Sequence, residues 1–154
     1  MKTFFFFALL LVIGIIQKTH AQRRAEAKFN LEYITDYNIM LDGGCSNYTY
    51  DTADLNTNIY VFVIAATPTR TAFMKIAGNN ENVFLKLVGK KPGKGDVDYH
   101  HVFTGGVYNV IVDTKKIYEL DSFNNLYIGT LTIEHNGVIS KIKVRGSVDK
   151  HAWQ

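Results

Sequence analysis

Residues 126–145 have the sequence LYIGTLTIEHNGVISKIKVR, and this stretch decides the fold class. Two runs of alternating apolar and polar residues flank Asn136-Gly137, a dipeptide that tolerates the positive φ angles of a two-residue type I′ turn. The stretch therefore predicts a β-hairpin. The face expected in the core carries Leu131, Ile133, His135, Val138, Ile142 and Val144. The face expected in water carries Thr130, Thr132, Glu134, Ile139, Lys141, Lys143 and Arg145.

Similar short runs elsewhere favour strands over helices. They are residues 29–33, 37–41, 59–64, 71–76, 83–88 and 107–112, bounded by Gly, Pro, Asn or Asp. The run 59–64 is β-branched and aromatic throughout, which suits a strand buried on both faces. Residues 113–121 are interpreted as a loop or single turn. Together with the hairpin, the runs predict an all-β antiparallel β-sandwich of about eight strands, with an up-and-down β-barrel as the alternative.

The first 21 residues have the pattern of a secretory signal peptide. Lys2 precedes an apolar run from Phe4 to Ile16, and small residues stand at Thr19 and Ala21. A run of 13 residues is shorter than the roughly 20 that cross a bilayer, so no transmembrane segment is expected. The prediction is a secreted, extracellular protein with a single domain over residues 22–154.

Composition excludes several classes of protein. The chain of 154 residues is 47% hydrophobic with two Pro and one Cys, which excludes disorder, collagen and an intrachain disulfide framework. From residue 22 onward there are 15 basic and 14 acidic residues, so nucleic acid is not an expected partner. Residues 70–154 nevertheless hold twelve basic and eight acidic residues, which makes this half the expected place for an anionic partner.

Parts of the second half resemble a known family. Residues 83–89 (VFLKLVG) form an aliphatic run that ends in glycine, residues 126–133 (LYIGTLTI) place a glycine within an alternating strand, and residues 138–144 (VISKIKV) form a closing strand. These segments resemble PLAT domains (polycystin, lipoxygenase, alpha-toxin) of the type found at the C-terminus of secreted lipases. The resemblance covers roughly residues 59–146. It implies an eight-stranded sandwich whose loops contact lipid surfaces or partner proteins, and it implies no catalysis.

Two departures limit what the resemblance implies. Residues 65–70 (AATPTR) replace the family's Gly- and Asp-rich loop, so calcium binding is not carried over. The tight turn at Asn136-Gly137 replaces a longer connection. Lipase activity is not expected, because no serine lies in a Gly-x-Ser-x-Gly sequence.

Two basic segments are the candidate membrane-binding or partner-binding residues. Lys141, Lys143 and Arg145 alternate along one strand face, about 6 to 7 Å apart, and each contributes up to ~1 kcal/mol against an anionic lipid surface. Lys90, Lys91 and Lys94 lie in a loop with Gly93 and Gly95 that lacks the order of a phosphate-binding loop. An outer strand face or a turn needs the same residues to stay soluble. The alternative that these residues only make the surface soluble, and bind no partner, therefore stays open.

The remaining candidates concern metal ions and covalent modification. Asp96, Asp98 and His100 recur every second residue, so an extended segment would offer all three to a metal ion from one side. Three ligands from one strand cannot surround an ion, so the favoured alternative is a solvated loop edge, and no metal or cofactor is predicted. His101 and His135 are interpreted as packing residues. Cys45, expected in a loop, is a candidate for an interchain disulfide in a homodimer. Asn47, in the sequon Asn47-Tyr48-Thr49, is a candidate glycosylation site expected in the same loop.

These observations give two hypotheses of function. The first is a secreted, non-enzymatic module that binds a lipid surface or a partner protein through its basic second half. The second is a lipocalin-like carrier of a small apolar ligand, built as an up-and-down barrel. Strand order and the filling of the interior discriminate between them.

Overall fold

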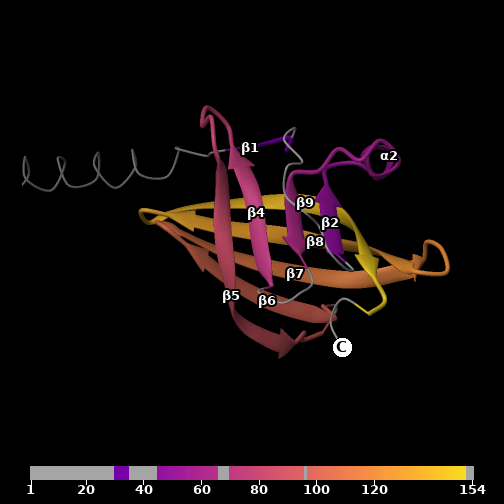
Figure 1. Ribbon diagram of the computed structural model, residues 1–154. Coiled ribbons are helices and arrows are strands. Elements are labelled where there is room, and N and C mark those ends of the chain that lie inside the picture. Colours follow the sequence, from indigo (N-terminus) through magenta and orange to yellow (C-terminus); the bar gives the residue numbers. More distant parts are fainter. Residues whose placement is uncertain (1–29, 35–44, 66–69, 96, 152–154) are drawn as a thin grey trace, which may run out of the picture.

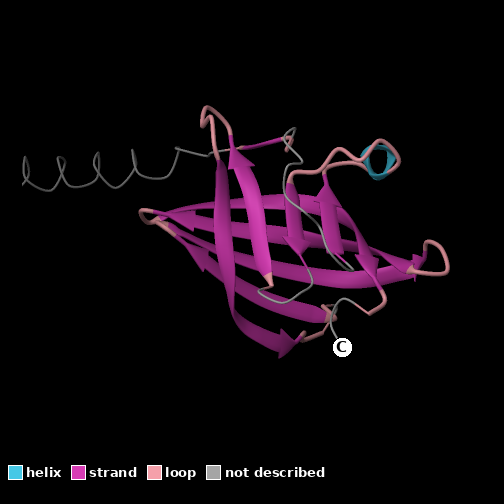
Figure 2. Cartoon of the chain, viewed as in Figure 1, coloured by secondary structure: helices cyan, strands magenta, loops and turns pink. Residues whose placement is uncertain are grey.

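The computed structural model describes residues 30–34, 45–65, 70–95 and 97–151. Figure 1 shows the arrangement, and Figure 2 shows that strands dominate it. The elements are β1 (Leu31–Glu32), β2 (Cys45–Thr49), α2 (Thr52–Leu55), β3 (Phe62–Ala65), β4 (Thr71–Ile76), β5 (Asn82–Pro92), β6 (Tyr99–Gly105), β7 (Tyr108–Glu119), β8 (Asn124–His135) and β9 (Val138–Asp149). The predicted signal peptide and the predicted strand 37–41 lie outside the described residues.

Strands β2 to β9 form a closed barrel. Each pairs antiparallel with the next along the chain, and β9 pairs back onto β2 to complete the ring. In Figure 1, β2, β3 and β4 cross in front of the long strands β7, β8 and β9. The all-β prediction is confirmed, and the strand order is that of the up-and-down alternative. The β-sandwich is not confirmed, because the pairing of β4 with β5 joins the strands into one closed sheet.

The hairpin predicted from residues 126–145 is confirmed. His135 pairs with Val138, and Asn136 and Gly137 have φ angles of 50° and 76°, as a type I′ turn requires. The predicted faces are confirmed too, since Leu131, Ile133 and Val144 are buried while Lys141 and Lys143 are exposed.

The barrel interior is filled by side chains from every strand of the ring. The fully buried ones include Tyr48, Phe62, Phe103, Leu131 and Ile133. The rings of Phe62 and Phe103 meet edge to face with centroids 5.9 Å apart. Burial of these rings together with the other apolar side chains of the core stabilises the closed barrel.

Strand β3 is buried on both faces, as its sequence predicts. Phe62 and Ile64 face the barrel core, while Val63 packs outside it with Ile34, Tyr60 and Phe73. Ile34 reaches this outer cluster because its backbone N–H donates to the carbonyl of Tyr60, at 2.7 Å. The short N-terminal segment therefore covers one side of the barrel.

Three local predictions are wrong. Residues 113–119 continue β7 instead of forming a loop; from Lys115 to Glu119 every side chain is exposed, so alternation of burial is lost there. Strand β5 runs on through Lys90 and Lys91 to Pro92, which were expected in a loop. Cys45 and Asn47 lie in β2, because β2 pairs with β3 on one side and with β9 on the other.

Candidate functional site

The predicted basic residues of the last strand lie together on the outside of the barrel. Lys141, Lys143 and Arg145 are exposed on β9, and the inward residues between them, Ile142 and Val144, pack in the core. Arg145 pairs across the sheet with Ile128, which pairs in turn with Lys115 of β7. We call Lys115, Lys141, Lys143 and Arg145 the basic strand surface.

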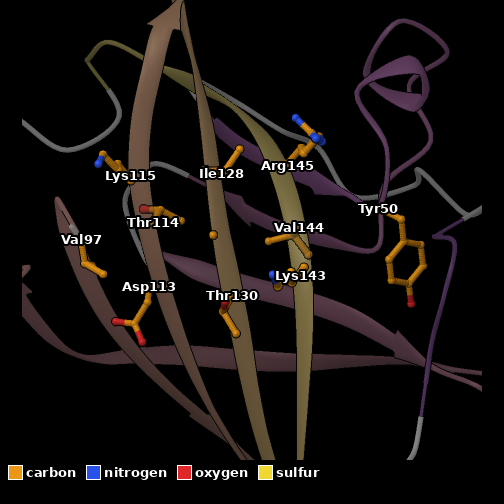
Figure 3. A pocket seen from close by; sticks show the side chains of 11 residues that line it. Tyr50, Val97, Asp113, Thr114, Lys115, Ile128, Thr130, Lys143, Val144 and Arg145 are labelled. Carbon is orange, nitrogen blue, oxygen red and sulfur yellow. The ribbon is translucent and has the colours of Figure 1, made fainter.

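A groove of about 630 Å³ crosses this surface over β7, β8 and β9. Figure 3 shows Val97 and Lys115 on one side of it and Tyr50 on the other. Its lining residues are Tyr50, Val97, Asp113, Thr114, Lys115, Ile128, Gly129, Thr130, Lys143, Val144 and Arg145. Three cations and a single carboxylate therefore line a hollow that also has apolar walls.

The wall formed by Tyr50 is held in place by a hydrogen bond. The Tyr50 hydroxyl donates to the carbonyl oxygen of Leu31 at 2.7 Å, which ties the segment after β2 to the N-terminal strand. Burial of the Tyr50 ring raises the pKa of its hydroxyl, so this group stays a neutral donor. The groove thus has a fixed aromatic rim beside Arg145.

The one carboxylate of the groove is already engaged. Asp113 Oδ1 lies 2.7 Å from His100 Nδ1, and the two residues are direct neighbours on β7 and β6. Both side chains are about one-third exposed, at 33% each. Asp113 therefore already has a partner on the neighbouring strand.

The second predicted basic segment borders the same region. Lys91 and Lys94 line a smaller hollow of about 270 Å³, together with Pro92, Val97, His100 and Asp113. Val97 and Asp113 line both hollows, so the structure brings Lys91 and Lys94 next to the groove that holds Lys143 and Arg145. Lys90 and Lys141 are exposed but do not line either hollow.

Of the eleven residues that line the groove, only Lys143 and Arg145 were predicted as site residues, and Lys115 and Tyr50 are two that sequence reasoning missed. Lys115 fell in the segment interpreted as a loop, and Tyr50 follows a strand that was not recognised. The signal for Lys115 was present, because Asp113 and Lys115 continue the alternation of Asn109 and Ile111 along β7. The signal for Tyr50 was absent, since its place beside Arg145 depends on the pairing of Thr49 with Arg145.

Two of the candidate metal ligands are engaged in contacts with other groups of the protein. Asp98 Oδ2 accepts a hydrogen bond from the backbone N–H of Lys116, and His100 is bound to Asp113. Asp96 lies outside the described residues. Within the part of the chain that the structure describes, no three His, Cys, Asp or Glu side chains form a group that could hold a metal ion.

The two histidines interpreted as packing residues are in aromatic contacts. His101 is 1% exposed inside the barrel and stacks on Tyr99, with ring centroids 5.6 Å apart. His135 stacks on Tyr108 with centroids 4.6 Å apart. Both interpretations are confirmed.

Cys45 and Asn47 are neighbours on the outside of β2. The Asn47 side-chain amide donates to Cys45 Sγ at 3.3 Å, and both side chains are half-buried. Burial raises the pKa of the Cys45 thiol, which disfavours the thiolate that disulfide exchange requires. The interchain disulfide and the glycan remain predictions.

Comparison with protein-family models, curated proteins and solved structures gives no match for this chain. The resemblance to PLAT domains therefore stays a prediction. Among the described residues, no helix has the length and apolar character needed to cross a membrane.

Proposed function

We propose that the protein is a secreted, non-enzymatic binding module that contacts an anionic lipid surface through the basic strand surface. The observation that carries the proposal is the groove, because Lys115, Lys143 and Arg145 surround it together. Lysine supplies a point charge to a phosphate, and the guanidinium of arginine binds phosphate through two parallel hydrogen bonds.

The charges of β9 are available for such contacts. Among the ion pairs of the described residues, none involves Lys141, Lys143 or Arg145. Because their attraction to anionic lipid adds up residue by residue at ~1 kcal/mol each, a cluster binds where a single lysine does not. Lys91 and Lys94 extend the cluster beyond the groove.

Reversing Lys141, Lys143 and Arg145 to Glu is expected to weaken binding to phosphatidylserine-containing vesicles at least about tenfold. The three side chains are exposed, so the midpoint of thermal unfolding should change little. Co-sedimentation with vesicles measures the binding, and wild-type binding should weaken as salt shortens the Debye length.

Lys86→Glu is the matched control, because Lys86 is also an exposed strand lysine but lies on β5, away from the groove. It should change binding far less than Lys143→Glu alone. Salt-independent binding retained by the triple variant would reject the basic strand surface. Absence of wild-type binding to any anionic vesicle would reject a lipid partner and favour a protein partner.

The carrier of a small apolar ligand is the second candidate, and the closed up-and-down order of the strands favours it. The interior opposes it, since Tyr48, Phe62 and Phe103 occupy the space that a ligand would need. We expect titration with a fluorescent fatty acid to give no saturable signal. Saturable binding that the Phe103→Trp variant abolishes would instead establish an interior ligand site.

A further inference from the structure

The turn between β7 and β8 presents an unusual group of exposed apolar side chains. Ile117, Tyr118, Leu120 and Phe123 are exposed by 45%, 50%, 40% and 69%. We call these four residues the hairpin tip. The turn projects beyond the barrel at the right of Figure 1. Large exposed apolar side chains gathered at one projecting point mark an interaction site.

The hairpin tip is held in a fixed turn. Asp121 Oδ1 accepts hydrogen bonds from the backbone N–H groups of Phe123 and Asn124, at 2.7 and 2.8 Å. The Leu120 N–H donates to the Asn124 carbonyl at 2.9 Å, and the Lys150 N–H donates to the Phe123 carbonyl at 2.8 Å. Because the turn is already ordered, docking it onto a partner costs little conformational entropy.

Two lysines lie at the base of the hairpin tip, where they share the carboxylate of Glu119, and Asp121 lies in the turn itself. Glu119 is paired with Lys150 at 3.2 Å and with Lys116 at 3.6 Å. Lys115 lies two residues before Ile117 and belongs to the basic strand surface. An apolar projection with lysines at its base is the arrangement that binds an anionic membrane, since apolar groups enter the interface while the cations stay at the headgroups.

Lys115, two residues before Ile117 on β7, links the hairpin tip to the groove. Lys115 pairs with Ile128, an exposed residue that lines the groove and pairs with Arg145. An anionic bilayer can bind the apolar hairpin tip and the basic strand surface at once, because it has an apolar interior below a layer of anionic headgroups.

We infer that the hairpin tip inserts into the headgroup–acyl boundary of an anionic bilayer, about 5–10 Å deep, while the basic strand surface contacts the headgroups. This inference rests on the proposed function and adds the element that anchors the protein. Phe123, as the most exposed of the four side chains, lies deepest in the lipid.

The test uses the full-length secreted chain and phosphatidylcholine vesicles with and without phosphatidylserine. The double variant Leu120→Ser/Phe123→Ser is expected to bind anionic vesicles at least about tenfold more weakly than wild type. The matched control is Val107→Ser/Ile139→Ser, which removes two apolar side chains exposed by 59% and 58% at the opposite end of the barrel, one just before β7 and the other near the start of β9. It should bind within about twofold of wild type.

A second measurement does not depend on affinity. Phe123→Trp, in a Trp153→Phe background, should show a blue shift of indole emission on anionic vesicles and quenching by brominated lipid. The equivalent Val107→Trp variant should show neither.

The outcomes separate the two proposals. If wild type binds anionic vesicles and the Leu120→Ser/Phe123→Ser variant binds equally well, the inference fails while the proposed function stands. Equal losses in the tip and control variants, or an unquenched indole at position 123 on bound protein, also overturn it. If wild type binds no anionic vesicle, the proposed function and the inference both fail, and a protein partner is favoured.

Discussion

Acidification from pH 8 to 5 is expected to lower the free energy of unfolding by on the order of 2 kcal/mol through His101 alone. His101 is 1% exposed inside the barrel. Burial, followed by repulsion from Lys90 and Arg70, lowers the pKa of its imidazole from 6.5 to about 4. Between these two values the unfolded chain binds a proton that the folded protein does not, so stability is lost as the pH falls through this window.

Urea denaturation followed by circular dichroism at several pH values measures this effect. The window above pH 5 separates the effect of His101 from that of the carboxylates of Glu32, Glu119 and Asp121, because their pKa values are lowered from 4.5, 4.5 and 3.8. Stability contributed by those carboxylates is lost at more acidic pH.

His101→Phe tests the assignment, since it keeps an aromatic ring against Tyr99 and Phe103. The variant should show a flatter dependence of stability on pH between 5 and 8. His151→Gln, at an exposed position, should keep the wild-type slope. An unchanged slope in His101→Phe would place the titration elsewhere.

Local features of this fold were predictable from the sequence, and long-range ones were not. The hairpin at Asn136-Gly137 was found because the turn and both strands lie within twenty residues, and the burial of each side chain follows its alternation. The closure of the barrel depends on Tyr48 meeting Gly146, and no local pattern encodes a contact between residues so far apart. Sandwich and barrel were therefore indistinguishable.

Strand β6 shows a signal that was present and missed. Tyr99, His101 and Phe103 alternate toward the core, but His101 is counted as polar, so the run did not stand out as apolar. At the end of β7, by contrast, the sequence carries no signal of a strand. Ile117 and Tyr118 are both exposed, and a register shift lies between Lys116 and Tyr118, so no alternation remains there.

The same difference between local and long-range features applies to the residues of the candidate site. Lys143 and Arg145 were predictable because alternation alone puts them on the outer face of β9. Their neighbours Lys115 and Tyr50 come from β7 and from the segment after β2, and only the pairing of β7, β8, β9 and β2 brings them together.

Replacement of Gly146 by alanine is expected to cost about 3 kcal/mol of stability, near the upper end for overpacking a core. Gly146 lies on β9 opposite Tyr48 of β2, at the seam that closes the barrel. A Cβ atom at position 146 would overlap two ring carbons of Tyr48. Because the ring is 1% exposed and packs against Phe62, it has no free space into which it can move.

Gly89→Ala is the matched control, since a Cβ there would lie 3.6 Å from Val102, an ordinary contact. Urea unfolding should place this control within about 1 kcal/mol of wild type. The double variant Tyr48→Leu/Gly146→Ala identifies the cause. If the tyrosine ring is the obstacle, the two substitutions together cost less than the sum of their separate effects, because leucine leaves room for the new methyl group. If the losses in the free energy of unfolding are strictly additive, Gly146 is needed for the backbone conformation of β9 and not for the packing of Tyr48.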